Sequence, residues 1–136
     1  MSLQRIKTLH GDFAAALRRL REAVNEDIGK GSIVVDGTIQ RFEFTFELAW
    51  KLAQAVLRHE GIEANAPRSV VKEAFKLKLI RAGDSWIDLL EDRNRTSHIY
   101  DEQQSLQVYG RIKEHHVRLF EELGIAVEQF IREAGS

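Results

Sequence analysis

Cysteine is absent from the 136-residue sequence, which excludes disulfide bonds, thiolate zinc fingers and thiol nucleophiles. No hydrophobic run approaches the roughly 20 residues that a membrane-spanning helix requires, and the N-terminus lacks the apolar core of a signal peptide. These absences predict a cytoplasmic protein that does not insert into a membrane.

An excess of either charge is also missing, since 20 basic residues face 21 acidic ones and the net charge is −1. This balance excludes a generally basic nucleic-acid-binding chain and an acidic tail protein. Any contact with nucleic acid therefore requires a local basic cluster. Hydrophobic residues make up 43% of the sequence, which is enough for a core, so we expect one globular domain over residues 1–136.

Proline is nearly absent, with Pro67 as its only example, whereas the helix-favouring Ala, Leu, Glu, Lys and Arg are abundant. Hydrophobic residues recur at steps of three and four, which is typical of amphipathic helices. We expect a first helix from Leu3 that stops near residues 25–27, followed by a loop at 28–36. A second helix should run from an N-cap at Asp36 to Gly61 and a third from Pro67 to Gly83. A fourth should start at Trp86, capped by Asp84 or Ser85, and a fifth should follow Asp101.

These lengths predict an all-α fold, an antiparallel up-and-down four-helix bundle with an additional short helix. The second helix is apolar on more than one side, so it is either the central helix of the bundle or the seam of a dimer. Asp101 and Gln104 resemble a capping box, although a continuous helix through residue 101 is an alternative. The expected core positions are Leu3, Ile6, Leu9, Phe13, Leu17, Leu20, Val24, Ile39, Phe42, Phe46, Ala49, Ala53, Val56, Val70, Val71, Ala74, Phe75, Leu77, Leu79, Tyr109, Ile112, His116, Phe120, Leu123, Val127 and Phe130.

The fourth helix contains an anomaly, because its apolar stripe turns polar without leaving the inward-facing arc of a helical wheel. Buried polar side chains are costly unless they are paired, so such a cluster indicates a site or an interface. The alternative is an ordinary solvated helix end. The polar members of the arc are Arg93, Asn94, Ser97, His98 and Tyr100.

An arginine followed five positions later by a histidine occurs three times, as Arg5 with His10, Arg93 with His98 and Arg111 with His116. Only the second pair has Asn94 directly after its arginine and Tyr100 two positions beyond its histidine. We therefore interpret the other two pairs as coincidences. Adjacent His115 and His116 face different ways on a helix and no third ligand follows at metal-site spacing, so we expect no metal, and no cofactor.

Residues 93–102, Arg-Asn-Arg-Thr-Ser-His-Ile-Tyr-Asp-Glu, resemble the RN-x-T-S-H-x-Y-D-E signature of the nucleotidyltransferase substrate-binding family. They also satisfy the R-x4–6-H motif of the HEPN superfamily and the R-x4-H-x-Y form of its HepT toxin group. The resemblance continues through residues 46–51, 61–62, 67–75 and Trp86. It implies a HEPN helical bundle, a homodimer, and a cognate minimal nucleotidyltransferase encoded alongside as partner.

The chemistry fits these residues, because metal-independent RNA cleavage needs a base for the 2′-hydroxyl and a cation for the developing phosphorane charge. His98 would be the general acid/base, Arg93 the phosphate clamp, and Asn94 would orient the imidazole or a phosphate. Arg93 and His98 lie about 140° apart on one helix, so two copies facing each other would complete a cleft. The resemblance further implies that the partner modifies Tyr100 with AMP groups, which would block that cleft.

Two functions follow from the resemblance. In the first, the protein is a HepT-type HEPN ribonuclease toxin neutralised by its nucleotidyltransferase antitoxin, and its substrate is RNA. In the second, it is a non-catalytic subunit that holds an RNA or nucleotide substrate for the transferase. The intact set of Arg93, Asn94, His98 and Tyr100 favours the enzyme. The near-neutral net charge argues against it, because a ribonuclease benefits from a basic groove.

Overall fold

The computed structural model describes residues 3–99 and 101–135, and this part of the chain is helical with connecting turns and contains no β-strand. The all-α expectation is confirmed. The elements are α1 (Leu3–Val24), η1 (Ile28–Lys30), α2 (Ser32–His59), α3 (Pro67–Lys76), α4 (Gly83–Arg95), η2 (Thr96–His98), α5 (Glu102–Arg111), η3 (Ile112–His116) and α6 (Val117–Ala134). Two of the short elements, η1 and η2, are 3₁₀ turns, whereas η3 is π-helical.

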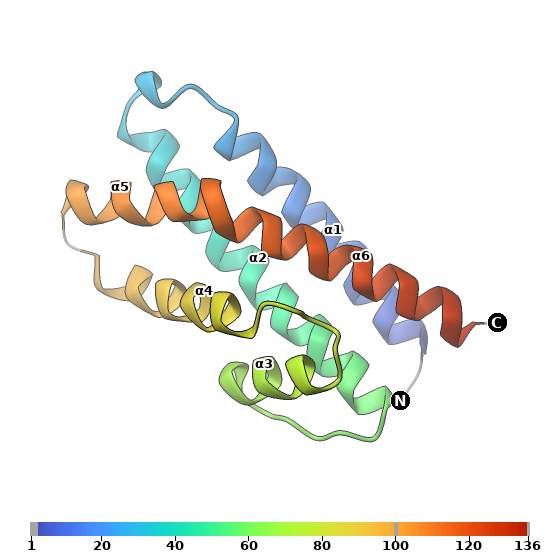
Figure 1. Ribbon diagram of the computed structural model, residues 1–136. Helices are drawn as coiled ribbons and strands as arrows, with labels where there is room; N and C mark the ends of the chain where they lie inside the picture. The colour runs from blue at the N-terminus through green and yellow to red at the C-terminus, as the bar shows by residue number, and fades with distance from the viewer. Residues whose placement is uncertain (1–2, 100, 136) are drawn as a thin grey trace.

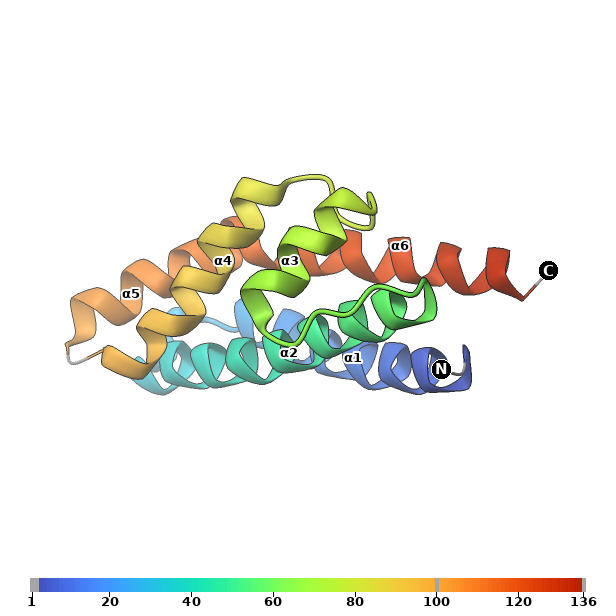
Figure 2. The same ribbon diagram turned by 90° about the horizontal axis from the view of Figure 1, so that it is seen from below.

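The long helices lie side by side. Figure 1 shows α1 and α2 running antiparallel, while α5, η3 and α6 follow one another along a single rod that crosses them. In Figure 2, α1 and α2 lie along one side of the molecule, with α3, α4 and the α5–α6 rod over them. The short additional helix α3 sits between α2 and α4 in the chain and contacts both.

The core occupies the space between these layers, and α2 passes through its centre. Helix α2 contacts α1, α3, α4, α5 and α6, so the expectation that it has several neighbours is confirmed. Aromatic rings from four helices meet there, with Phe120 within 6.0 Å, centroid to centroid, of Phe13, Phe42 and Trp86. Trp50 is half-buried against this core, whereas Phe44 is 57% exposed.

The expected core positions are mostly buried, with a few departures. In α1, all of the expected positions from Ile6 to Val24 are buried and Leu3 is partly buried, and all of the positions named in α2 are buried. Phe75 was wrongly placed in the core, because α3 is short and its outer face is turned to solvent, leaving that ring half exposed. Leu77 and Phe130 are only partly buried.

Three predicted helix boundaries were wrong, and backbone geometry explains two of them. Gly31 has a φ of 116°, which lets the chain turn, so α2 begins at Ser32. Residues 32–36 of the expected loop, including the expected N-cap at Asp36, therefore lie inside α2, whereas residues 28–31 remain outside it. Lys78 has a φ of 67°, so α3 has already ended at Lys76 instead of Gly83. Helix α4 then starts at Gly83, slightly before the expected Trp86.

Two other predicted boundaries were confirmed. Helix α2 ends before Gly61, whose φ is 79°, and the Ile62 amide donates to the Leu57 carbonyl at 2.8 Å, which is a Schellman arrangement. Asp101 caps α5 by accepting a hydrogen bond from the Gln104 amide at 2.8 Å. The alternative of a continuous helix is wrong, since the backbone at Ile99 is extended.

Among the helices that the structure describes, none combines the length and the hydrophobicity required to cross a membrane.

Candidate active site at the end of α4

The predicted site residues gather where α4 gives way to α5, at one end of the molecule (Figure 1). Arg93 lies in the last turn of α4 and is half-buried. Its Nη1 atom lies 3.3 Å from Glu43 Oε2 on α2, and Thr96 Oγ1 lies 2.7 Å from the same carboxylate oxygen. Glu43 therefore holds both the guanidinium of Arg93 and the turn that follows it.

The remaining predicted residues do not face inward. Asn94 and His98 are exposed, and so is Ser97, so the inward-facing arc was wrong for them, although it was partly right for Arg93. For Ser97 and His98 the reason is that α4 ends at Arg95 and continues as a 3₁₀ turn, in which three residues complete a turn, so the helical wheel no longer applies. Asn94 still belongs to α4 but is exposed in its last turn. Tyr100 lies outside the described residues.

Directly before Arg93, the structure buries a carboxylate that the sequence analysis did not single out. Asp92 is 1% exposed and accepts hydrogen bonds from three side chains. Arg111 reaches it through Nε at 2.7 Å and Nη2 at 2.8 Å, Arg95 through Nη1 at 2.8 Å, and His116 through Nε2 at 2.7 Å. We call Asp92, Arg95, Arg111 and His116 the Asp92 cluster.

The cluster keeps Asp92 ionised. Burial by itself raises the pKa of this carboxyl group, but hydrogen bonds from His116, Arg111 and Arg95 outweigh it and hold the pKa well below its usual range. The hydrogen bond to Asp92 in turn raises the pKa of Arg111. Because an ionised carboxylate only accepts hydrogen bonds, His116 donates from Nε2, and its ring stacks on Phe42 with 5.5 Å between ring centroids.

The π-helical segment η3 makes this cluster possible. Residues five apart point about 140° away from each other on an α-helix, so Arg111 and His116 would not reach one carboxylate. In a π-turn the residue at i+5 takes the place above residue i that i+4 takes in an α-helix. Arg111 and His116 therefore converge on Asp92, and the pair interpreted as a coincidence has a structural role next to the candidate site.

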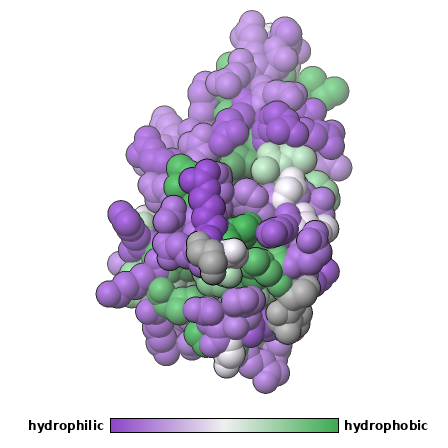
Figure 3. Space-filling model, turned by 90° about the vertical axis from the view of Figure 1, so that its right-hand side faces the viewer, coloured by the Kyte–Doolittle hydropathy of each residue, from purple (hydrophilic) through white to green (hydrophobic). Residues whose placement is uncertain are grey.

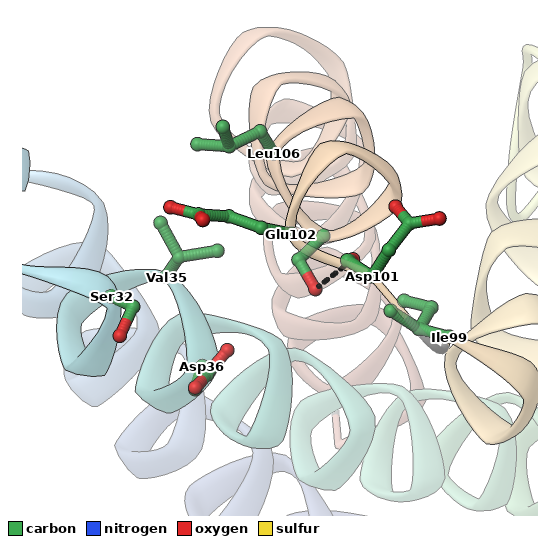
Figure 4. A pocket seen from close by; sticks show the side chains of 8 residues that line it. Ser32, Val35, Asp36, Ile99, Asp101, Glu102 and Leu106 are labelled. Atoms are coloured by element: carbon green, nitrogen blue, oxygen red, sulfur yellow. Dashed lines mark hydrogen bonds between the residues drawn. The ribbon is translucent and has the colours of Figure 1, made fainter.

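A hollow of about 370 Å³ opens beside the site, between the start of α2 and the start of α5. Figure 4 shows Val35 and Asp36 of α2 on one side of it and Glu102 and Leu106 of α5 on the other, with Ile99 and Asp101 at its edge. Its three carboxylates make it acidic. Even so, residues 3–99 and 101–135 contain no group of three or more acidic or histidine side chains placed to hold a metal ion.

The opposite end of the molecule has a different character. Figure 3 looks at the end where α1 begins and α6 ends, where hydrophilic side chains surround a smaller group of hydrophobic ones. A larger hollow of about 830 Å³ lies between the α3–α4 connection and α6, lined in part by Trp86, Leu123 and Phe130. Of the two hollows, the one next to the predicted catalytic residues is therefore the smaller.

Comparison with known proteins decides the family. Residues 9–129 match the family described as nucleotidyltransferase substrate binding protein like. This chain belongs to that family. The match includes residues 93–102, on which the resemblance in the sequence rests, and the arginines of the Asp92 cluster.

Relatives of this nucleotidyltransferase substrate-binding chain agree with the assignment. It is 32% identical over 84 residues to a Haemophilus influenzae protein described as a probable ribonuclease HepT, and the alignment spans 58% of each protein. The chain thus spans little more than half the length of this curated relative. A crystal structure of a Thermus thermophilus protein is 33% identical, with a TM-score of 0.76, covering 88% of this chain and 98% of that one.

A second solved structure shares the fold at lower identity. It is a Haemophilus influenzae protein described as revealing the fold of a substrate binding domain of a nucleotidyltransferase. It is 23% identical, with a TM-score of 0.68, and the alignment covers 94% of this chain and 100% of that one.

Proposed function

We propose that this protein is a HepT-type HEPN ribonuclease that cleaves RNA without a metal ion and is neutralised by a cognate minimal nucleotidyltransferase encoded alongside it. The observation that carries the proposal is the pairing of a fixed arginine with an exposed histidine. Arg93 is held by Glu43, while His98, in the turn that follows, is open to a substrate. The relative described as a probable ribonuclease HepT supports it.

In the proposed reaction, His98 takes the proton from a 2′-hydroxyl, whose oxygen attacks the neighbouring phosphorus. The bond from phosphorus to the 5′-oxygen breaks, and the leaving oxygen takes a proton from a histidine in its acid form. The guanidinium of Arg93 binds the phosphate oxygens and stabilises the charge that develops on them. Asn94, which is exposed on the same turn of α4, orients a phosphate or the imidazole.

The proposed active unit is a homodimer, since the exposed residues of one chain leave the site open on one side. Asn94 and His98 face solvent at the end of α4, and a second copy facing this end would supply a second histidine and enclose the scissile bond. Excluding water in this way strengthens the interaction between arginine and phosphate.

Regulation is proposed to act at Tyr100, which carries an AMP group after modification by the partner transferase. The proposal rests on the spacing of Tyr100 from His98 in the motif. Each AMP group adds negative charge close to the phosphate clamp, and like charge repels the RNA backbone.

Substitution of the two proposed catalytic residues tests this function. His98→Ala and Arg93→Ala should each lower cleavage of total RNA by about 10²–10⁴-fold while the helical circular dichroism spectrum is retained. His59→Ala is the matched control, because His59 is the last residue of α2 and lies away from the end of α4. This variant should cleave RNA at the wild-type rate. His116 is unsuitable as a control, since it is buried against Asp92.

The second candidate function is a non-catalytic subunit that holds a substrate for the transferase, and the family description favours it. Undiminished cleavage by folded His98→Ala, or no cleavage by the wild-type protein, would support this alternative. Expression of each gene alone separates the two further, because only a ribonuclease arrests growth in the absence of its partner.

A further inference from the structure

Two arginines beside the candidate site share one buried oxygen atom. Arg95 Nη1 and Arg111 Nη2 both lie 2.8 Å from Asp92 Oδ1. Their guanidinium groups are therefore neighbours, although they come from the last turns of two different helices, α4 and α5. The R-x4-H-x-Y motif prescribes neither of them.

The outer edges of both guanidinium groups face solvent. The side chains of Arg95 and Arg111 are 60% and 41% exposed, whereas that of Asp92 is 1% exposed. Nη1 of Arg95, and Nε and Nη2 of Arg111, donate hydrogen bonds to Asp92. The described residues offer no acceptor to the remaining nitrogens, so these donors are available to a ligand.

The charge of the group favours an anion. Two guanidinium groups share one carboxylate, which leaves an excess of one positive charge that a buried, fixed Asp92 holds in place. Because the whole chain has a net charge of −1, this is the kind of local basic cluster that nucleic-acid binding requires here. Guanidinium groups bind phosphate oxygens through paired, charge-assisted hydrogen bonds.

We propose that Arg95 and Arg111 form a phosphate subsite, which binds a backbone phosphate of single-stranded RNA next to the nucleotide on which His98 acts. Arg95 directly precedes the 3₁₀ turn at Thr96–His98 and lies three residues before His98. Residues three apart share a face in a 3₁₀ turn, so the subsite lies on the side of the proposed base. The choice of RNA as the ligand rests on the proposed function.

The acidic side chains nearby give the bound strand a direction. Asp101 and Glu102 lie at the start of α5, and Arg111 lies about 13 Å further along the same helix at 1.5 Å per residue. The carboxylates repel phosphate from the start of α5, whereas its last turn attracts it. The RNA backbone therefore runs from His98 toward Arg111, away from the acidic hollow.

Binding of an uncleavable RNA tests the subsite without requiring catalysis. The probe is a fluorescein-labelled oligouridine with every 2′-hydroxyl methylated, and its affinity is measured by fluorescence anisotropy at several salt concentrations. Arg95→Gln removes the charge but leaves Asp92 bonded to Arg111 and His116, so the protein should remain folded. We expect its Kd to rise about tenfold, and the slope of log K against log salt to fall by about 0.7, as expected for one lost phosphate contact.

Arg58→Gln is the matched control, because it makes the same change of charge at an exposed position at the far end of α2. Its Kd should stay within about twofold of the wild-type value. Equal effects of Arg58→Gln and Arg95→Gln, or no binding of the probe by the wild-type protein, would overturn the subsite.

The same measurements keep the two proposals apart. RNA cleavage with a normal Kd for Arg95→Gln overturns the subsite alone and leaves the ribonuclease in place. Binding that depends on Arg95 in a protein that never cleaves RNA supports the subsite and overturns the ribonuclease. His98→Ala should bind the methylated probe as tightly as the wild-type protein, because the proposed role of His98 is to remove the 2′-hydroxyl proton and the probe has no such proton.

Discussion

Asp92 connects the stability of the molecule to its candidate site. Its carboxylate accepts hydrogen bonds from α4, from the end of α5 and from η3, so it ties the last turn of α4 to the long C-terminal rod. Arg93 follows it directly in the chain, and its own guanidinium turns the other way, toward Glu43 on α2. Adjacent residues thus fix one short turn of helix from two sides.

Removal of this carboxylate should therefore be costly. We expect Asp92→Ala to lower the free energy of unfolding by about 3–5 kcal/mol at pH 7, because it leaves the buried ends of Arg111 and His116 without their acceptor. Urea denaturation followed by circular dichroism measures the change. Asp88→Ala, an exposed position one turn earlier in α4, should change the free energy by less than about 0.5 kcal/mol.

The contribution of Asp92 should also depend on pH in a defined direction. The pKa of Asp92 is lower in the folded protein than in the unfolded chain. The ionised carboxylate therefore stabilises the folded state fully above the unfolded-state pKa of about 3.9, and this contribution is lost as the pH falls toward the folded-state pKa. The difference in stability between the wild-type protein and Asp92→Ala should therefore narrow between pH 7 and pH 3. A difference that stays constant over this range would contradict the role given to the ionised carboxylate.

At the scale of the elements, the π-turn in the C-terminal rod determines which side chains reach the site. An α-helix through residues 112–116 would keep the rod straight but would separate Arg111 from His116 around its axis. The π-turn brings both to one carboxylate, and it also buries His116 against Phe42 of α2. Turns of this kind arise from one extra residue in a helix and are frequent at functional sites.

Deletion of Lys113, an exposed residue within η3, should convert the π-turn to an α-turn. Arg111 and His116 would then be four residues apart, the spacing that places two side chains on one face of an α-helix, so both should still bind Asp92 and the free energy of unfolding should change by less than about 0.5 kcal/mol. The measurements are circular dichroism and urea denaturation. Lys113→Ala keeps the extra residue and should also be neutral to within about 0.5 kcal/mol, and a deletion variant less stable than this control by about 2 kcal/mol or more would refute the argument.

The whole molecule exposes hydrophobic side chains close to the site. Phe44 is 57% exposed on α2, directly after the Glu43 that binds Arg93. Single exposed hydrophobic residues are common on protein surfaces, so Phe44 serves here as a position at which the proposed homodimer can be tested. The proposed homodimer would cover this ring and bring two copies of the end of α4 together.

Replacement of Phe44 by Asp should therefore shift the protein from dimer to monomer in sedimentation velocity at micromolar concentration, because it places a charge in the proposed seam. Ile125→Asp is the control, since Ile125 is 70% exposed on α6, away from the end of α4, and should leave the dimer intact. A wild-type protein that sediments only as a monomer, or a dimer unaffected by Phe44→Asp, would contradict the proposed assembly.

The sequence by itself determined the helical class, the buried stripes of α1 and α2, the Gly61 terminator, the Asp101 cap and the motif at residues 93–102. All of these depend on residues close together in the chain, where periodicity and capping act. Only the tertiary structure decided that Asp92 is buried and that Arg111 and His116 bind it, because the π-turn and the packing of the C-terminal rod onto α4 bring distant segments together. The exposure of His98 was decided there too, since the length of α4 depends on how Thr96 and Arg93 dock on Glu43 of α2.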